Sequence, residues 1–284
     1  MTAVPAAIRT ILLCLTAEEA CAALVRSGAA LARRHGAHLV GLHVLEAMPV
    51  YPGYGMDVPA PLIEPFTAAR REQAQRIEAI FRKGTEGDTF AAEWRGVKTE
   101  STTAVDRMIE SARAADLVVM SRPEQGPGYG EARGLQHEVI RASGRPVLVL
   151  PGGEAPEAIG RRVLVGWSAT REAARAVHDA LPLLEPGAEL TLLRVAGGGS
   201  DELADAVSNE LAAALARHGA KVTVTHRERD GASVAQLLLR EAFEIDADLV
   251  VTGAFGHSRA YDFVIGAATS ELLRTATLPA LFSK

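Results

Sequence analysis

Residues 115–121 of this 284-residue chain read ADLVVMS, and residues 247–253 read ADLVVTG, the same stretch 132 positions later with two changes. Each is an acidic turn followed by a short apolar run, which is the pattern of a buried strand. A second pair, GAHL at residues 36–39 and GAEL at 187–190, lies 151 positions apart. A repeat on this scale predicts two diverged copies of one domain.

The two spacings differ by about 19 residues, so the first copy carries an insertion between these landmarks. We place it at about residues 46–66, a stretch rich in Pro, Gly and Tyr. The predicted domains are therefore residues 1–151 and 161–284. Residues 151–160 are the predicted linker.

Strands and helices are expected to alternate through both copies. Apolar runs of four to six residues between amphipathic stretches indicate parallel strands that helices cover on both faces. Right-handed crossovers then make each copy a doubly wound α/β sandwich. The expected strands are 10–15, 37–44, 91–94, 117–120, 147–150, 162–165, 189–195, 221–225, 249–252 and 280–282. The expected helices are 18–35, 67–82, 104–113, 135–142, 171–181, 202–218, 233–244 and 269–275.

Composition excludes several classes of protein. Hydrophobic residues make up 48% and charged residues 23%, and a net charge of −5 gives no basic footprint for nucleic acid. The chain contains no apolar run long enough to span a bilayer, and the apolar run at residues 11–15 is too short for a secretory signal. Cys14 and Cys21 are the only cysteines, and we expect packed thiols. A cytoplasmic location fits these features.

Glycines mark a candidate binding loop in the second copy. GAFG at residues 253–256 follows a predicted strand, and GAAT at 266–269 opens a predicted helix. Glycine lacks a Cβ, so such a turn brings backbone N–H groups close to a phosphate, and a helix N-terminus adds a positive dipole end. This is an anion cradle in outline, although it matches neither a P-loop nor the dinucleotide fingerprint. Relief of backbone strain is the simpler interpretation of glycines in a loop.

The spacing of Gly253, Gly256 and Gly266, the residues HSR at 257–259 and the closing LPAL at 278–281 resemble the nucleotide-binding signature of the universal stress protein family. Residues 163–167 and 171–177 are also similar to that family's first strand and helix, so the resemblance covers the chain as a tandem pair. It implies two five-stranded parallel sandwiches with strand order 3-2-1-4-5. It also implies binding of ATP or another adenine nucleotide, with Mg²⁺ only alongside the nucleotide.

Carried over by position, the resemblance assigns two groups of residues to the nucleotide. Ser168 and Val195 would flank the base and ribose. The phosphates would be lined by Gly253, Gly256, His257, Gly266, Ala267, Ala268 and Thr269.

The chain departs from the family pattern in ways that weaken this site. ATP-binding members usually carry Asp where this chain has Ser168 and Thr16, and Ser or Thr where it has Ala267. Each lost hydrogen bond to a charged group is worth roughly 1.5–3 kcal/mol. In the first copy Ser121, Glu124 and Arg133 replace the three glycines, and Glu124 would repel phosphate. We therefore expect the phosphate site of the first copy to be lost.

Other candidate sites are weaker. GWSAT at 166–170 resembles a nucleophile elbow, with Asp230 or Asp246 and then His257 in hydrolase order. We expect Ser168 to cap a helix instead, as we expect of Thr16, which forms a capping-box pattern with Glu19. No His or Cys spacing predicts a metal site. Residues 246–248 (DAD) are read as a solvated turn, or as a contact to Mg²⁺ beside a nucleotide.

Three functions remain open at this point. The first is a stress-response protein without catalytic function, or with very slow ATP hydrolysis, that binds an adenine nucleotide in the second copy. The second is a nucleotide-independent interaction module that acts through a dimer or a client protein. A serine hydrolase is the third. We also predict that the two copies pair within the chain through strands 147–150 and 280–282, and a homodimer of such chains stays open.

Overall fold

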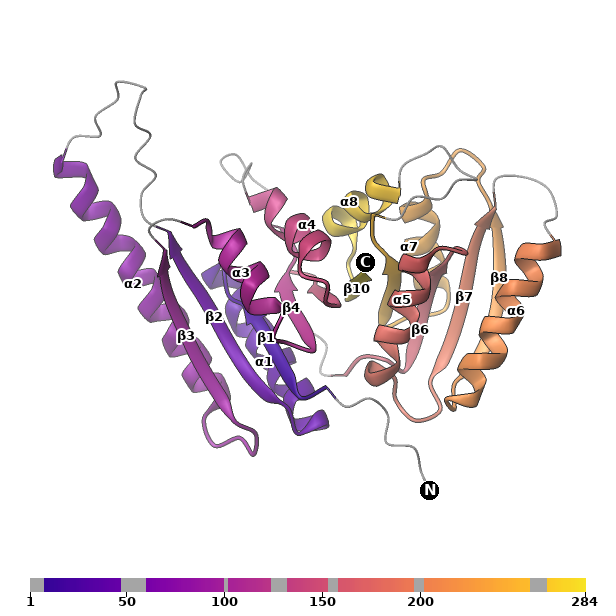
Figure 1. Ribbon diagram of the computed structural model, residues 1–284, viewed down its shortest axis with the longest axis horizontal. Coiled ribbons are helices and arrows are strands. Elements are labelled where there is room, and N and C mark those ends of the chain that lie inside the picture. Colours follow the sequence, from indigo (N-terminus) through magenta and orange to yellow (C-terminus); the bar gives the residue numbers. More distant parts are fainter. Residues whose placement is uncertain are drawn as a thin grey trace.

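The computed structural model describes residues 8–46, 60–99, 102–123, 132–152, 158–196, 202–255 and 265–284. Strands and helices alternate through both copies, and Figure 1 shows the copies side by side. The first copy contains β1 (Thr10–Cys14), α1 (Glu18–His35), β2 (His38–Glu46), α2 (Ala60–Thr85), β3 (Ala92–Thr99), α3 (Ala104–Ala112), β4 (Leu117–Ser121), α4 (Ala132–Ala142) and β5 (Val147–Leu150). The second contains β6 (Arg162–Trp167), α5 (Arg171–Ala180), the 3-10 turn η1 (Leu181–Leu183), β7 (Glu189–Ala196), α6 (Glu202–Arg217), β8 (Lys221–Glu228), α7 (Val234–Glu244), β9 (Leu249–Gly253), α8 (Ile265–Thr275) and β10 (Ala280–Ser283).

The strands of the described residues form one ten-stranded sheet, in the order β3-β2-β1-β4-β5-β10-β9-β6-β7-β8. Within each copy the strands run parallel in the order 3-2-1-4-5, which confirms the predicted fold class. The copies meet where β5 and β10 pair antiparallel, with Leu148 opposite Leu281. The predicted pairing of the last strands is therefore confirmed, and it removes two sheet edges from solvent.

Alternation along each strand divides the core into two layers. Ile11 and Leu13 of β1 pack in the layer that α1, α2, α5 and α6 cover. Leu12 and Cys14 point to the other layer, beneath α3, α4, α7 and α8. Successive strand side chains point to opposite faces, so a strand covered on both sides must be apolar throughout.

The acidic residue that opens each repeated stretch holds the first strand of its copy. The carboxylate of Asp116 accepts hydrogen bonds from the backbone N–H groups of Arg9 (2.9 Å) and Thr10 (3.0 Å). Asp248, 132 positions later, accepts from Gly160, Arg161 and Arg162 at 2.7–3.0 Å. The predicted solvated turn at 246–248 is thus a structural anchor at the amino ends of β6 and β9, away from the glycine motif.

The predicted cap of α1 and the predicted start of α2 are wrong. Residue Ala17, rather than Thr16, is the N-cap of α1, and no side chain caps it. Glu18 and Glu19 lie in the first turn instead, where their charges favour the positive end of the helix dipole. Helix α2 begins at Ala60 and continues through Pro65, so part of the predicted insertion at 46–66 is helical. Pro65 is the sixth residue of this helix, where proline has no N–H to donate to the carbonyl four residues earlier.

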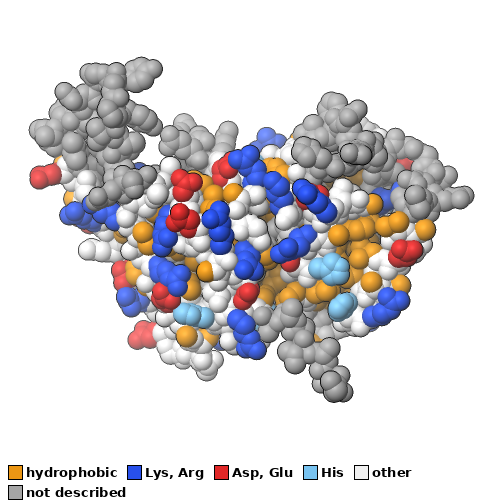
Figure 2. Space-filling view, viewed as in Figure 1, with side chains coloured by type: hydrophobic (Ala, Val, Ile, Leu, Met, Phe, Trp, Pro, Cys, Tyr) orange, Lys and Arg blue, Asp and Glu red, His pale blue; other side chains and the backbone are white. Residues whose placement is uncertain are grey.

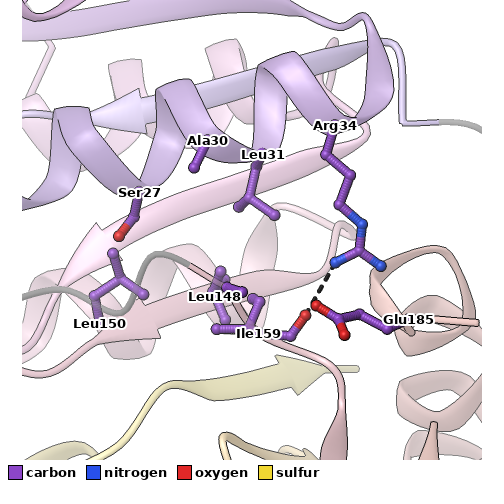
Figure 3. A pocket seen from close by; sticks show the side chains of 9 residues that line it. Ser27, Ala30, Leu31, Arg34, Leu148, Leu150, Ile159 and Glu185 are labelled. Carbon is purple, nitrogen blue, oxygen red and sulfur yellow. Dashed lines mark hydrogen bonds between the residues drawn. The ribbon is translucent and has the colours of Figure 1, made fainter.

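Arginines of the first copy reach the second. The guanidinium of Arg34 donates to the carbonyls of Ile159 (3.0 Å), Leu183 (3.0 Å) and Leu184 (2.6 Å), and Figure 3 shows this side chain at the edge of a small cavity. Arg122 donates to the carbonyl of Ala276 at 3.0 Å. These bonds satisfy carbonyls at the ends of η1 and α8, which have no partners within their helices.

Basic side chains gather across the middle of the face shown in Figure 2, with acidic side chains among them. On α3, Arg107 pairs with Glu110 at 3.2 Å, and on α4, Arg141 pairs with Glu138 at 2.7 Å. The face therefore carries mixed charge. Across the described ranges, no helix has the length and apolarity that crossing a bilayer requires.

Candidate functional site

The second copy forms a crevice at the carboxyl ends of its strands. Trp167 on β6 pairs with Arg194 on β7, which places Ser168 beside Val195 at this edge. Gly166 pairs with Thr252 on β9, so Gly253 lies at the same edge on the other side of β6. The strand order reverses between β6 and β9, and open α/β sheets bind ligands at this reversal.

Ser168 does not cap the following helix as predicted. Thr170 is the N-cap of α5, and its hydroxyl accepts from the N–H of Ala173 at 3.3 Å. The hydroxyls of Ser168 and Thr170 lie 3.2 Å apart, and the carbonyl of Ser168 accepts from the N–H of Thr170 at 2.7 Å. Ser168 therefore forms part of the turn before α5, and Thr170 caps the helix.

Gly253 lies in close contact with the first turn of α5. A Cβ built on this glycine would lie 2.5 Å from the nitrogen of Ala173 and 2.6 Å from the carbonyl carbon of Glu172. Backbone atoms in a capped helix cannot move aside as a flexible side chain can. Packing against α5 therefore requires glycine at position 253. This reason is separate from the predicted approach of a phosphate.

The turn after β9 is held in an unusual conformation. The N–H of Ala254 donates to the carbonyl of Ser283 at 2.8 Å, which continues the pairing with β10. Phe255 then has φ of 54°, in the left-handed region that costs a residue with a side chain roughly 1–2 kcal/mol. Its ring packs against that of His137 from α4, with centroids 5.8 Å apart. Strain of this kind concentrates at functional sites.

Helix α8 presents its first turn to this loop. Gly266, Ala267 and Ala268 lie in that turn and Thr269 begins the next one, because α8 begins at Ile265, one residue before the GAAT stretch predicted to open it. The nearest atom to a Cβ at Gly266 would be Cδ1 of Phe255, 3.9 Å away, so this glycine is not packed against backbone. The N–H groups of a first helical turn lack intrahelical partners, so an anion is favoured here. Gly256, His257 and Glu124 lie outside the described residues.

The hydrolase arrangement is not supported by the positions of its members. Asp246 precedes β9 and pairs with Arg162 at the first residue of β6. Ser168 follows the opposite end of β6, roughly 20 Å away at 3.3 Å per strand residue. Asp230 follows β8, and β7 lies between β8 and β6. Neither carboxylate is placed to orient a base for Ser168.

The first copy contains a cavity that our sequence reasoning missed. It measures about 310 Å³ and lies at the carboxyl ends of β1 and β2, beside the reversal of strand order between β1 and β4. Its lining comes from five elements and the residues that follow them: Leu15, Thr16, His43, Val44, Leu45, Arg70, Gln73, Ala104, Met108 and Leu135. We predicted that the first copy has lost its phosphate site. The cavity lies at the other end of this crevice, beside β1 and β2.

His43 is the buried polar group of this cavity. Its side chain is 7% exposed, and its Nδ1 lies 2.7 Å from the carbonyl oxygen of Leu15. The ring stacks on Trp94 with 12° between the planes. Burial lowers the pKa of His43, and the positive charge of Arg70 lowers it further against the opposing hydrogen bond to Leu15. The ring is therefore neutral at pH 7.

A second cavity, of about 110 Å³, lies between α1, β5 and the linker. Figure 3 shows that apolar side chains such as Leu31 and Leu148 line most of it, with Arg34 at one end. It is a packing gap at the joint between the copies. In the part of the chain that the structure describes, no group of three or more His, Cys, Asp or Glu is arranged to hold a metal ion.

The family model of the universal stress protein family matches residues 7–151 and again residues 160–284. The chain belongs to the universal stress protein family. As a universal stress protein it combines two family domains in one chain, and their sheets join through β5 and β10.

Solved structures agree with this universal stress protein fold. A universal stress protein from Archaeoglobus fulgidus DSM 4304 is 19% identical, covers 96% of each chain and superposes with a TM-score of 0.65. A putative universal stress protein from Pseudomonas aeruginosa UCBPP-PA14 is 16% identical over 98% of this chain and 94% of its own, with a TM-score of 0.55. At these identities the likeness shows the fold alone. A comparison with curated protein sequences gives no match.

Proposed function

We propose that this universal stress protein acts in the stress response by binding an adenine nucleotide in its second copy, without a catalytic role. Family membership supports the stress-response role. The observation that carries the nucleotide proposal is the approach of Gly266, in the first turn of α8, to Phe255, which follows β9 beside the reversal of strand order. Unpaired N–H groups and a helix dipole favour phosphate at this place.

The two ends of the nucleotide would meet different surfaces. The base and ribose would lie by Ser168 and Val195, and the phosphates would lie by Gly253 and the first turn of α8. A bound metal ion would be Mg²⁺ carried on the phosphates, since such ions are held largely by phosphate oxygens and water. Gly256 and His257 would complete the phosphate loop.

Isothermal titration with ATP and AMP tests the proposal. Cyclic AMP belongs among the titrants, because it is the ligand in the crystal structure of a universal stress protein 21% identical to this chain over 52% of its length. We expect one nucleotide per chain. Gly266→Asp places a carboxylate at the phosphate position and should abolish binding.

The matched control is Gly134→Asp. Gly134 lies in the first turn of α4, and a Cβ there would meet no atom within 4 Å. This variant introduces the same charge into the first turn of the equivalent helix in the other copy, one position further along, so nucleotide affinity should not change. Two nucleotides per chain, or binding indifferent to Gly266→Asp, would contradict the proposal. No binding, and no nucleotide released on denaturation, would favour the nucleotide-independent interaction module.

A further inference from the structure

The helix of the proposed phosphate site is contacted by the first copy at two places. Helices α4 and α8 lie side by side where the copies meet (Figure 1). His137 of α4 contacts α8 in its middle, with Nε2 2.8 Å from Oγ of Ser270. The guanidinium of Arg122 donates at 3.0 Å to the carbonyl of Ala276, the residue that follows α8. The first copy thus touches α8 along its length and at its carboxyl end.

His137 reaches both sides of the phosphate site. The hydroxyl of Ser270 donates to the carbonyl of Gly266 at 2.7 Å, so its oxygen accepts from His137. These hydrogen bonds connect the first copy to the first turn of α8. The ring of His137 also packs against Phe255, which has φ of 54° in the turn after β9. One side chain of the first copy therefore contacts both the helix and the turn beside which the phosphates would lie.

Arg122 contacts the carboxyl end of α8, and the second copy does not return this contact. The N–H of Arg122 donates to the carbonyl of Leu150 at 2.8 Å. The N–H of Ala254 donates to Ser283 at the same distance of 2.8 Å, so positions 122 and 254 are equivalent. Alanine at 254 has no side-chain donor for the reciprocal bond. The guanidinium also places a positive charge where the dipole of α8 favours a cation.

Both residues lie where the first copy would have its own phosphate site, which the sequence predicts to be lost. Arg122 follows Ser121, the residue that replaces the first glycine of the motif. Gln136 is buried and donates to the carbonyl of Ser121 at 3.1 Å, so α4 is bonded directly to the end of β4. His137 is the next residue of α4. Residues of this lost site therefore contact the second copy.

We propose that the first copy serves as a fixed support for the phosphate site of the second, with His137 and Arg122 as positioning residues that act through α8. This inference rests on the nucleotide function proposed above. Backbone N–H groups bind phosphate best when they are aligned before the ligand arrives, because ordering them on binding costs affinity. The support should therefore matter for the phosphates and not for the base, which would lie by Ser168 and Val195.

Variants of the full-length protein test the support by isothermal titration. His137→Leu removes the N–H donor but keeps an apolar side chain against Phe255, and Arg122→Met removes the guanidinium at similar length. We expect each variant to bind ATP roughly tenfold more weakly and adenosine with an affinity within about twofold of the wild type. His137→Gln keeps an N–H donor and should restore most of the ATP affinity.

The matched control for Arg122 is Arg145→Met. Arg145 donates to the carbonyl of Arg113 at 3.0 Å, at the end of α3, so its bond has the same chemistry but stays within the first copy. ATP affinity should not change in this variant. A loss equal to that of Arg122→Met would overturn the inference.

Hydrogen exchange of the ligand-free protein separates this inference from the nucleotide proposal. Amides of α8 should exchange faster in His137→Leu and Arg122→Met than in the wild type, whereas those of α6 should not change. If the wild type binds no nucleotide, the proposed function fails, and exchange in α8 still decides whether the first copy holds this helix. Unchanged exchange of α8 in both variants, or equal losses of affinity for ATP and adenosine, would overturn the inference.

Discussion

His137 Nε2 lies 2.8 Å from Ser270 Oγ, and the two residues occupy the same position of α4 and α8 in the two copies, 133 residues apart. Leu148 and Leu281 face each other in the sheet with the same spacing. Both pairs lie where a pseudo-twofold axis relates the copies. The hydroxyl of Ser270 donates to the carbonyl of Gly266 at 2.7 Å, so its oxygen accepts from His137. The first copy therefore contacts the proposed phosphate helix one turn after Gly266.

The joint between the copies should depend on the Leu148–Leu281 pair. Both side chains are fully buried. Leu281→Asp would bury a carboxylate without a partner, and we expect a loss of about 4 kcal/mol or more in the free energy of unfolding. Urea denaturation measures this loss and should show the copies unfolding in separate steps. Leu281→Ile is the control, and a similar loss in both variants would contradict the interpretation.

Substitution of two glycines separates helix packing from ligand binding. Gly253→Ala should cost about 2 kcal/mol, because its Cβ would lie 2.5 Å from the backbone of α5. Gly266→Ala should change stability by less than about 1 kcal/mol, because its Cβ has space and alanine favours a helix. Thermal unfolding of the two variants provides the comparison. Equal stability of both variants would show that α5 shifts readily to accept a side chain at 253.

The anchoring carboxylates should matter equally in the two copies. Asp116→Asn and Asp248→Asn each weaken bonds to backbone N–H groups at the start of a central strand, and we expect losses of about 1–3 kcal/mol. Chemical denaturation at neutral pH measures the effect. Asp230→Asn removes an exposed carboxylate and serves as the control. If Asp248→Asn leaves the free energy of unfolding unchanged, other contacts of the linker must hold the start of β6.

Stability should fall as the pH drops below 6.5. Burial lowers the pKa of both His35 and His43 from 6.5, so the folded protein binds fewer protons than the unfolded chain between that value and the lowered values. The free energy of unfolding therefore decreases with falling pH in this window and is fully retained above it. His43→Asn should flatten part of this dependence in urea titrations at several pH values. His218→Asn, at an exposed position, should leave the slope as it is in the parent protein.

Both cysteines should resist thiol reagents in the native protein. Burial raises the pKa of Cys14 to about 12, and burial together with Glu18 and Glu19 raises that of Cys21 to about 12. The reactive species is the thiolate, which is then nearly absent at neutral pH. Reaction with Ellman's reagent should be slow until denaturant is added, when two thiols should react. Rapid modification of the folded protein would show that this region opens locally.

The architecture follows from local patterns in the sequence. Short runs such as LVVMS at 117–121 are apolar on both faces, which is sufficient to predict parallel strands between helices. The repeat predicted two copies that meet through the last strand of each, and the structure shows that these strands, β5 and β10, pair antiparallel. Helix α1 begins and ends where periodicity and Gly36 predicted. These features depend on residues close together in the chain or on the repetition of such patterns.

Tertiary structure decided the features that need contacts between distant segments. The sequence does not distinguish Ser168 from Thr170 as the cap of α5, since both are good caps and only the path of the turn selects one. The reason for glycine at 253 is the backbone of α5, which lies 80 residues earlier in the chain. The cavity of the first copy is assembled from β1, β2, α2, α3 and α4. Spacing along a sequence specifies strands and turns, but the volume enclosed by five elements depends on how their side chains pack together.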